Sequence, residues 1–220
     1  MTELLLPKTS GRETSLQNAS DQSAQQRSSS DRPSRDEAVT AIRTLLKWIG
    51  EDPDREGLIE TPDRVLRAYS EFFAGYEQDP AEVLSKTFDE SGAYNGAVIV
   101  RDIDVRSHCE HHMVPFIGKA HVAYLPDAKV VGISKLARLV NGFARRLQIQ
   151  ERLTAEVART LMSSLKPRGV AVIIEAEHHC MTMRGIRNAG ATTVTQHLCG
   201  VYEEDPALRT EILRELRQRG

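Results

Sequence analysis

Two short clusters of histidine and cysteine, far apart along the chain, constrain what this sequence can fold into more than any other feature. The first reads SHCEHH at residues 107–112, and the second reads HHC at residues 178–180. Imidazole nitrogens and thiolate sulfurs are the donors that a borderline-soft ion such as zinc prefers. Because a long stretch separates the clusters, the fold has to bring them together before they can bind one metal ion.

Cys109, His112 and Cys180 are the candidate metal ligands. Cys109 and His112 are spaced like one half of a zinc site, and Cys180 would supply a second thiolate. Three protein ligands leave a coordination position for water, as in catalytic zinc sites, whereas a second histidine would close the site, as in structural ones. We favour the open site, because the remaining histidines would then supply acid–base groups beside the metal. Surface histidines without any metal are the remaining alternative.

An open metal site of this kind indicates hydrolytic chemistry. A bound metal ion lowers the pKa of its water ligand from about 15.7 to about 7, so that a nucleophile forms at neutral pH. A neutral histidine nearby can donate or accept a proton in the same pH range. The residues alone therefore indicate a hydrolase that attacks an electrophilic carbon, and they indicate nothing more specific.

Composition narrows the class of protein. A chain of 220 residues, 40% of them hydrophobic, can form one well-buried domain and a tail. The net charge of -2 gives no signature of nucleic-acid binding, and no apolar stretch approaches the roughly 20 residues that cross a bilayer. Three cysteines, an odd number, favour metal-binding thiolates in a reducing compartment over a disulfide framework. We predict a cytoplasmic protein with neither a nucleic-acid nor a membrane partner.

The chain is predicted to divide into a tail and one domain. Residues 1–33 are rich in Ser, Gln, Arg and Asp, offer little to bury, and are predicted to form a disordered tail. The domain at residues 34–220 is predicted to begin with a helical arm at residues 34–96. Its core follows at residues 97–220.

Hydrophobic periodicity predicts the elements of the domain. A helical period follows the capping-box pair Ser34 and Glu37, and another follows Thr61 and Pro62. In the core, alternation predicts strands and helical spacing predicts helices, with Ser134 as a helix cap. The predicted strands are residues 97–106, 115–125, 169–174 and 192–197, and the predicted helices are residues 134–147, 150–165 and 206–217. The order strand, strand, helix, helix, strand, strand indicates an α+β domain.

Two groups of basic residues are expected near the metal clusters. Lys135 and Arg138 lie one turn apart at the start of a predicted helix, where a helix N-terminus already favours anions. Arg184 and Arg187 follow the second cluster and flank Gly185, which permits a close backbone approach. Each arginine alone would be an ordinary surface charge. Two such groups beside one predicted metal site favour phosphate recognition.

The first turn of the predicted helix at residues 150–165 carries a carboxylate with two interpretations. Glu151 is either a partner of the helix dipole or an acceptor for the two N–H groups of a guanine edge. The residue pattern leaves both open. Arg64 and Arg67, on an earlier helix, are interpreted as surface residues unless the site of another subunit lies nearby.

Taken together, these motifs resemble the GTP cyclohydrolase I family, the zinc enzymes that begin pterin biosynthesis. The motifs, in order, are SHCEHH at 107–112, GISKLAR at 132–138, QERLT at 150–154, HHCM at 178–181 and RGIR at 184–187. Any one of them is weak, whereas five in this order are very specific. The resemblance extends from about Ser34 to the C-terminus.

The resemblance implies a role for each group of residues. The implied zinc ligands are Cys109, His112 and Cys180, and the implied catalytic histidines are His111 and His178. The implied guanine-binding pair is Gln150 and Glu151, and the implied triphosphate-binding residues are Ser134, Lys135, Arg138 and Arg184. Arg64 and Arg67 match positions that the family contributes from a neighbouring subunit.

The resemblance also implies a reaction and an assembly. GTP would lose C8 of its imidazole ring as formate and rearrange to 7,8-dihydroneopterin triphosphate, with His178 protonating the imidazole and His111 assisting at the sugar. The implied fold is the tunnelling fold, a β-β-α-α-β-β antiparallel sheet with helices on one face. Its units would join edge to edge into a β-barrel, which covers exposed strand edges. The implied homo-oligomer is a decamer of two pentamers with active sites at subunit interfaces.

Two alternatives compete with this interpretation. The first alternative is another enzyme of the same fold. A pyruvoyl-tetrahydropterin synthase would bind zinc through histidines only, and a queuosine-pathway nitrile reductase would need a nucleophilic cysteine and an NADPH motif. The paired cysteines and the Lys135–Arg138 group argue against both. The other alternative is a binding or scaffold protein with a structural zinc ion, which would unfold when the metal is removed.

Overall fold

The computed structural model describes residues 32–87 and 96–218. Residues 1–31 of the predicted tail therefore lie outside the described residues. The described helices are α2 (Arg35–Trp48), α3 (Thr61–Phe72), η2 (Ala74–Tyr76), η3 (Pro80–Leu84), α4 (Ile133–Ala144), α5 (Gln150–Leu165), α6 (His179–Thr182), α7 (Val201–Glu204) and α8 (Pro206–Arg217). The described strands are β1 (Val98–Cys109), β2 (Pro115–Leu125), β3 (Leu147–Gln148), β4 (Gly169–His178) and β5 (Thr192–Gly200). The chain forms two compact units, one ending at Leu66 and the other beginning at Arg67.

The first unit begins with the predicted capping box. The Ser34 hydroxyl accepts a hydrogen bond from the Glu37 backbone N–H at 3.3 Å, and the Glu37 carboxylate accepts one from the Ser34 backbone N–H at 2.8 Å. An ion pair between Arg35 and Asp63 joins α2 to the first turn of α3. Within the described part of the chain no residue of α2 is buried, and Trp48 is 81% exposed. The start of α2 is therefore fixed by its capping box, and an exposed ion pair joins the helix to α3.

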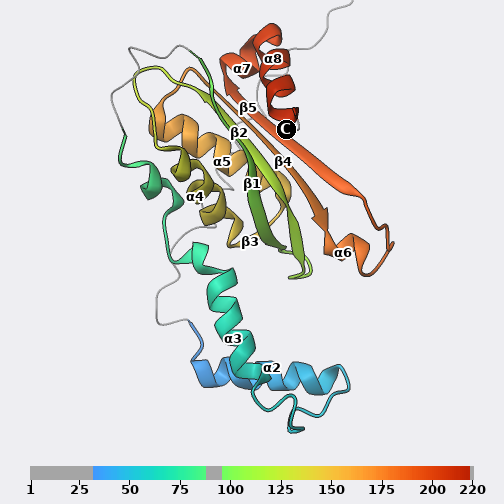
Figure 1. The fold of residues 1–220 in the computed structure, drawn as a ribbon. Helices are drawn as coiled ribbons and strands as arrows, with labels where there is room; N and C mark the ends of the chain where they lie inside the picture. The colour runs from blue at the N-terminus through green and yellow to red at the C-terminus, as the bar shows by residue number, and fades with distance from the viewer. Residues whose placement is uncertain (1–31, 88–95, 219–220) are drawn as a thin grey trace, which may run out of the picture. The chain divides into compact units, whose positions relative to one another are not determined.

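The second unit is built on a five-stranded sheet with the order β3-β1-β2-β4-β5 (Figure 1). The three long pairings, β1 with β2, β2 with β4 and β4 with β5, are antiparallel, and the two-residue β3 runs parallel to β1. The predicted strand at residues 115–125 and the predicted helices at 150–165 and 206–217 have the bounds of β2, α5 and α8. The α+β class is confirmed, and the element order is compatible with the tunnelling fold.

Helices cover both faces of the sheet. Against α4 and α5 the sheet presents one large core, which contains four residues of β2, Phe116, Ala120, Val122 and Tyr124. On the opposite face, Ala123, Ala171 and Ile173 pack with Ile212 and Leu216 of α8. The two helices inside the predicted unit, α4 and α5, therefore lie on one face, and α8, for which no face was predicted, covers the other. The uninterrupted apolar run of β4 is typical of a strand that is buried on both faces.

Smaller differences lie at element ends. Helix α4 begins at Ile133 with Gly132 as its N-cap, so Ser134 lies inside the first turn and is not the predicted cap. Leu147, predicted to end that helix, instead belongs to β3, where it pairs with His108. The short helices α6 and α7 were not predicted, because four residues are too few to show a helical period.

Membrane insertion finds no support in the described helices. Over residues 32–87 and 96–218, no helix is both long enough and apolar enough to cross a bilayer.

A glycine in β2 permits the close approach of β4. A Cβ atom added at Gly118 would lie 1.9 Å from the Glu175 carbonyl oxygen, whereas one added at Gly132 would meet no heavy atom within 4 Å. We expect Gly118→Ala to destabilise the fold by about 1–3 kcal/mol or more, because backbone cannot yield as a side-chain tip can. Gly132→Ala should change stability by less than about 1 kcal/mol. Thermal unfolding of both variants at equal protein concentration tests this, and equal midpoints would contradict it.

Candidate metal and catalytic site

The candidate metal ligands come from the ends of two strands that flank β2. Strand β1 ends at Cys109, and a tight turn follows, closed by hydrogen bonds from the Met113 N–H to the Cys109 carbonyl at 2.8 Å and from the Cys109 N–H to the Val114 carbonyl at 3.0 Å. Strand β4 ends at His178, and Cys180 follows in α6. The ends are neighbours because Phe116 of β2 pairs with β1 on one side and with β4 on the other.

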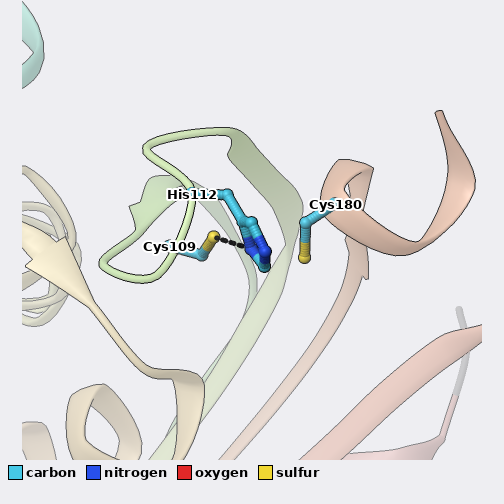
Figure 2. Close-up of side chains that lie close together, drawn as sticks. All are labelled: Cys109, His112 and Cys180. Carbon is cyan, nitrogen blue, oxygen red and sulfur yellow. Dashed lines mark hydrogen bonds between the residues drawn. The ribbon is translucent and has the colours of Figure 1, made fainter. Parts of the chain in front are cut away.

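These strand ends bring Cys109, His112 and Cys180 together (Figure 2). The ligand atoms of all three residues lie within 4.8 Å of one another. The Cys109 sulfur is 3.8 Å from His112 Nδ1. Cys109 is buried, Cys180 is half-buried and His112 is exposed, so the group opens to solvent on the histidine side. The clustering predicted from the sequence is confirmed as a group that could hold a metal ion.

The chemistry of this group fits a soft or borderline cation. Burial raises the pKa of the Cys180 thiol, and the neighbouring Cys109 thiol raises it further. Two thiolates this close are unfavourable on their own, whereas a bound cation deprotonates coordinating thiols. Two sulfurs and one imidazole match the donors of zinc and related ions and leave one position of a four-coordinate shell for a further ligand.

Arg184 lies directly at the metal group. Its Nη1 atom is 3.1 Å from His112 Nε2 and 3.4 Å from the Cys180 carbonyl oxygen. The guanidinium therefore places a permanent positive charge beside the exposed side of the group. An anionic substrate that approached the metal would meet this charge.

The two predicted catalytic histidines are close to the candidate ligands along the chain, His111 directly before His112 and His178 two residues before Cys180. His111 is exposed in the turn after β1, with its ring 6.3 Å from the ring of His112. His178 stacks on Phe116, with 4.7 Å between ring centroids and 8° between planes. Burial lowers the pKa of His178, and the negative charge of Glu151 acts in the opposite direction. His178 is therefore an imidazole whose ring plane is held by stacking and whose pKa is lowered by burial.

The predicted guanine-binding pair occupies two different environments. Gln150 is 1% exposed, and its side-chain amide hydrogen-bonds to His178 and to β4 and β5. Glu151 is exposed at the start of α5 and close enough to act on the charge of His178. Only Glu151 of this pair presents its polar group to solvent.

The predicted phosphate-binding residues on α4 are not joined to the metal group by hydrogen bonds among the described residues. Lys135 donates to the Lys86 carbonyl oxygen at 2.5 Å, and Ser134 and Arg138 are exposed on the same helix. Arg64 lies in the first unit and pairs with Glu60. Arg67 is exposed on α3, at the start of the second unit. Among the described residues of the second unit, the structure thus brings Arg184 to the metal group.

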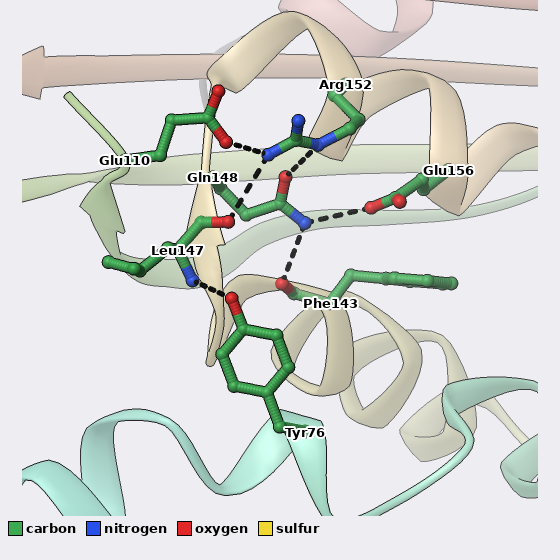
Figure 3. A network of polar contacts seen from close by, with 7 residues as sticks. All are labelled: Tyr76, Glu110, Phe143, Leu147, Gln148, Arg152 and Glu156. Carbon is green, nitrogen blue, oxygen red and sulfur yellow. Dashed lines mark hydrogen bonds and ion pairs between the residues drawn. The ribbon is translucent and has the colours of Figure 1, made fainter. Parts of the chain in front are cut away.

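A polar network that was not predicted from the sequence fixes the turn between β1 and β2 (Figure 3). Arg152 of α5 forms an ion pair with Glu110 in that turn, and it also donates to Gln148 Oε1 at 3.1 Å and to the Leu147 carbonyl at 3.3 Å. Gln148 Nε2 in turn donates to Glu156 at 2.8 Å. The available signal was that Glu110 and Arg152 are charged residues inside the SHCEHH and QERLT motifs.

Backbone contacts continue the same network. The Glu110 N–H donates to the Gln148 carbonyl at 3.0 Å, which extends the pairing of β1 with β3. The Leu147 N–H donates to the Tyr76 hydroxyl at 3.1 Å. The turn that carries Glu110 and the exposed ligand His112 is therefore tied to the first turn of α5 through β3.

Comparison with known proteins decides the family. A family model described as GTP cyclohydrolase I matches residues 38–217. The chain belongs to the GTP cyclohydrolase I family. The resemblance stated from the five sequence motifs is thereby confirmed, and the chain is an enzyme of the GTP cyclohydrolase I type.

Individual members of the GTP cyclohydrolase I family are very similar to this chain. The GTP cyclohydrolase 1 of Brucella anthropi is 62% identical over 169 residues, which cover 77% of this chain and 79% of the relative. The GTP cyclohydrolase 1 of Brucella suis is 60% identical over 173 residues, which cover 79% of this chain and 81% of the relative. Among solved structures, the apo archaeosine synthase QueF-Like is 16% identical with a TM-score of 0.40, covering 47% of this chain and 93% of its own.

The Glu110–Arg152 pair is expected to support metal binding by this GTP cyclohydrolase I family member. Removing an outer partner of a metal site typically costs about 10- to 100-fold in metal affinity. We expect Arg152→Met and Glu110→Gln each to weaken zinc binding by about 10-fold, since either frees the ligand-bearing turn. Competitive titration with a chromophoric chelator measures the affinity.

A double-mutant cycle separates this coupling from general destabilisation. The double variant Glu110→Gln/Arg152→Met should lose little more metal affinity than either single variant, because each substitution removes the same ion pair. Arg159→Met, which removes an exposed arginine from the same helix, should leave the affinity unchanged. If the losses of metal affinity in the double variant were fully additive, Glu110 and Arg152 would contribute independently and not as one pair.

Proposed function

We propose that this enzyme is a zinc-dependent GTP cyclohydrolase that hydrolyses the imidazole ring of GTP, releases C8 as formate and forms 7,8-dihydroneopterin triphosphate. This would be the first step of pterin biosynthesis, leading to tetrahydrofolate or tetrahydrobiopterin. The observation that supports it best is the group Cys109, His112 and Cys180, within 4.8 Å, in a chain of the GTP cyclohydrolase I family. Arg184 beside that group supports an anionic substrate.

Cys109, His112 and Cys180 would hold the zinc ion. When bound, zinc would supply a water of lowered pKa, the nucleophile that hydrolysis at C8 requires near neutral pH. Cys109 is fixed by its position at the end of β1, and Cys180 by α6, so two ligands would be preorganised by secondary structure. His112 lies in the turn that the Glu110–Arg152 pair ties to α5.

The histidines would move the protons of the reaction. His178 would protonate the imidazole nitrogen of the guanine base and so make C8 more electrophilic. Its lowered pKa makes its cationic form a stronger acid than free histidine, which favours transfer to a weakly basic nitrogen. His111, exposed beside the ligands, would assist proton transfer at the ribose during rearrangement and ring closure.

Charged side chains would hold the two ends of the nucleotide. Glu151 would accept hydrogen bonds from the guanine edge. Ser134, Lys135, Arg138 and Arg184 would bind the triphosphate, which carries roughly four negative charges, through charge-assisted hydrogen bonds. Arg64 and Arg67 would be supplied by a neighbouring subunit of a decamer made of two pentamers. Three free cysteines support a reducing, cytoplasmic location.

Formate release together with metal content tests the proposed function. The wild-type enzyme should release one formate for each GTP consumed, which neither alternative enzyme of the fold would do. Cys180→Ser should abolish zinc binding and formate release together, because one thiolate ligand is lost. Cys199→Ser is the matched control, since Cys199 lies in β5 outside the metal group and should retain both. Full activity of a zinc-free Cys180→Ser protein would contradict the proposal, and a collapsed fold would favour a structural metal.

A second prediction concerns the guanine base. We expect Glu151→Gln to raise the KM for GTP by about 10-fold or more, because a charge-assisted pair of hydrogen bonds to the base is weakened. Binding of inorganic triphosphate should change by less than about 2-fold, since that ligand has no base. Equal losses for the two ligands, measured by calorimetric titration and steady-state kinetics, would remove the base-reading role of Glu151.

A further inference from the structure

Gln150, the first residue of α5, has a buried side chain whose amide nitrogen is fully used by the protein. Nε2 lies 2.9 Å from the Ile174 carbonyl, 3.0 Å from the Thr193 carbonyl and 3.1 Å from Thr195 Oγ1. An amide nitrogen has two hydrogens to donate and accepts none, so these three acceptors take both. The orientation of the amide follows, because reversing it would set its oxygen against two backbone carbonyl oxygens.

The amide oxygen of Gln150 then faces His178. Oε1 lies 2.7 Å from His178 Nε2, which is the distance of a good hydrogen bond. An amide oxygen only accepts, so the hydrogen between the two atoms belongs to His178 Nε2. The stacking of the same ring on Phe116, with planes 8° apart, restricts its rotation. The plane and the tautomer of His178 are therefore both determined by contacts within the protein.

We infer that Gln150 is a positioning residue for His178 and does not read the guanine base through its side chain. Its carbonyl oxygen holds the imidazole with a hydrogen on Nε2, so the proton that His178 would give to the substrate is the one that its cationic form carries on Nδ1. This inference rests on the proposed function, in which His178 acts on the base. It replaces the role that family resemblance gave to Gln150 and leaves base recognition to the exposed carboxylate of Glu151.

The two roles differ in what the side chain must offer. A residue that reads a base needs donors or acceptors that only the ligand satisfies. Gln150 is 1% exposed, and its nitrogen and oxygen already have four protein partners. A positioning residue needs the opposite, a rigid place and one group directed at the catalytic side chain. The bonds to β4 and β5 supply that rigidity, because they anchor the amide on two strands of the sheet.

Steady-state kinetics of Gln150→Met distinguishes the two roles in the full-length, zinc-loaded enzyme. Methionine has a similar length and no polar group, so His178 would lose its acceptor and gain a second tautomer. We expect kcat for formate release to fall by about 10- to 100-fold, as for a misplaced catalytic group, while KM for GTP changes by less than about 3-fold. A raised KM with unchanged kcat, which is the signature expected for Glu151→Gln, would overturn the inference. Unchanged values of both constants would overturn it as well.

A spectroscopic measurement tests the same point without turnover. Nitrogen-15 NMR of histidine-labelled wild-type protein should show His178 with its hydrogen on Nε2, the signal being assigned by its loss in His178→Asn. In Gln150→Met the signal should shift to a mixture of tautomers. Gln196→Met, which removes an exposed glutamine of β5 whose side chain bonds Arg217, should leave it unchanged. A hydrogen on Nδ1 in the wild-type protein would overturn the inference, even if Gln150→Met failed to fold.

A wild-type enzyme that released no formate would refute the proposed function, while the tautomer of His178 would still decide the role of Gln150.

Discussion

The pairing of β2 with β1 on one side and with β4 on the other is the constraint on which the site depends. Phe116 lies opposite Ser107 in one ladder and opposite His178 in the other. This register places the end of β1, with Cys109, beside the end of β4, with Cys180 two residues beyond it. A slip of one residue in either ladder would turn the ligand side chains to the other face of the sheet. The metal group is thus a consequence of strand register.

Two glutamine side chains fix the turn after β1 and the proposed catalytic histidine, His178. Gln148 connects the turn after β1 to α5 through Arg152, and Gln150 connects His178 to β4 and β5. Both are buried, Gln148 in β3 and Gln150 at the start of α5, and a buried amide is stable only if its hydrogen bonds are satisfied. Because those hydrogen bonds are formed within the protein, the two amides keep fixed positions. The groups proposed to bind substrate, Glu151 and Arg184, are exposed.

Much of the fold and of the metal group could be predicted from the sequence. The long elements β2, α5 and α8 have strong periodicity, and the donor types in SHCEHH and HHC predict a group that could hold a metal ion. The two-residue β3 and the four-residue α6 have no period to detect. Ser134 was misplaced because a serine before an apolar run looks like a cap, whereas Gly132 takes that position. The roles of Gln148, Gln150 and Arg152 depend on contacts across the fold, which residue identity alone does not reveal.

The central claim is that the metal ion is bound by Cys109, His112 and Cys180 and keeps one coordination position for solvent. X-ray absorption spectroscopy at the zinc edge of the active, full-length enzyme tests this most directly. The account predicts two sulfur ligands, one imidazole and one further light-atom ligand that exchanges with added anions. A fourth protein ligand in the shell, or an active preparation that contains no metal, would contradict it.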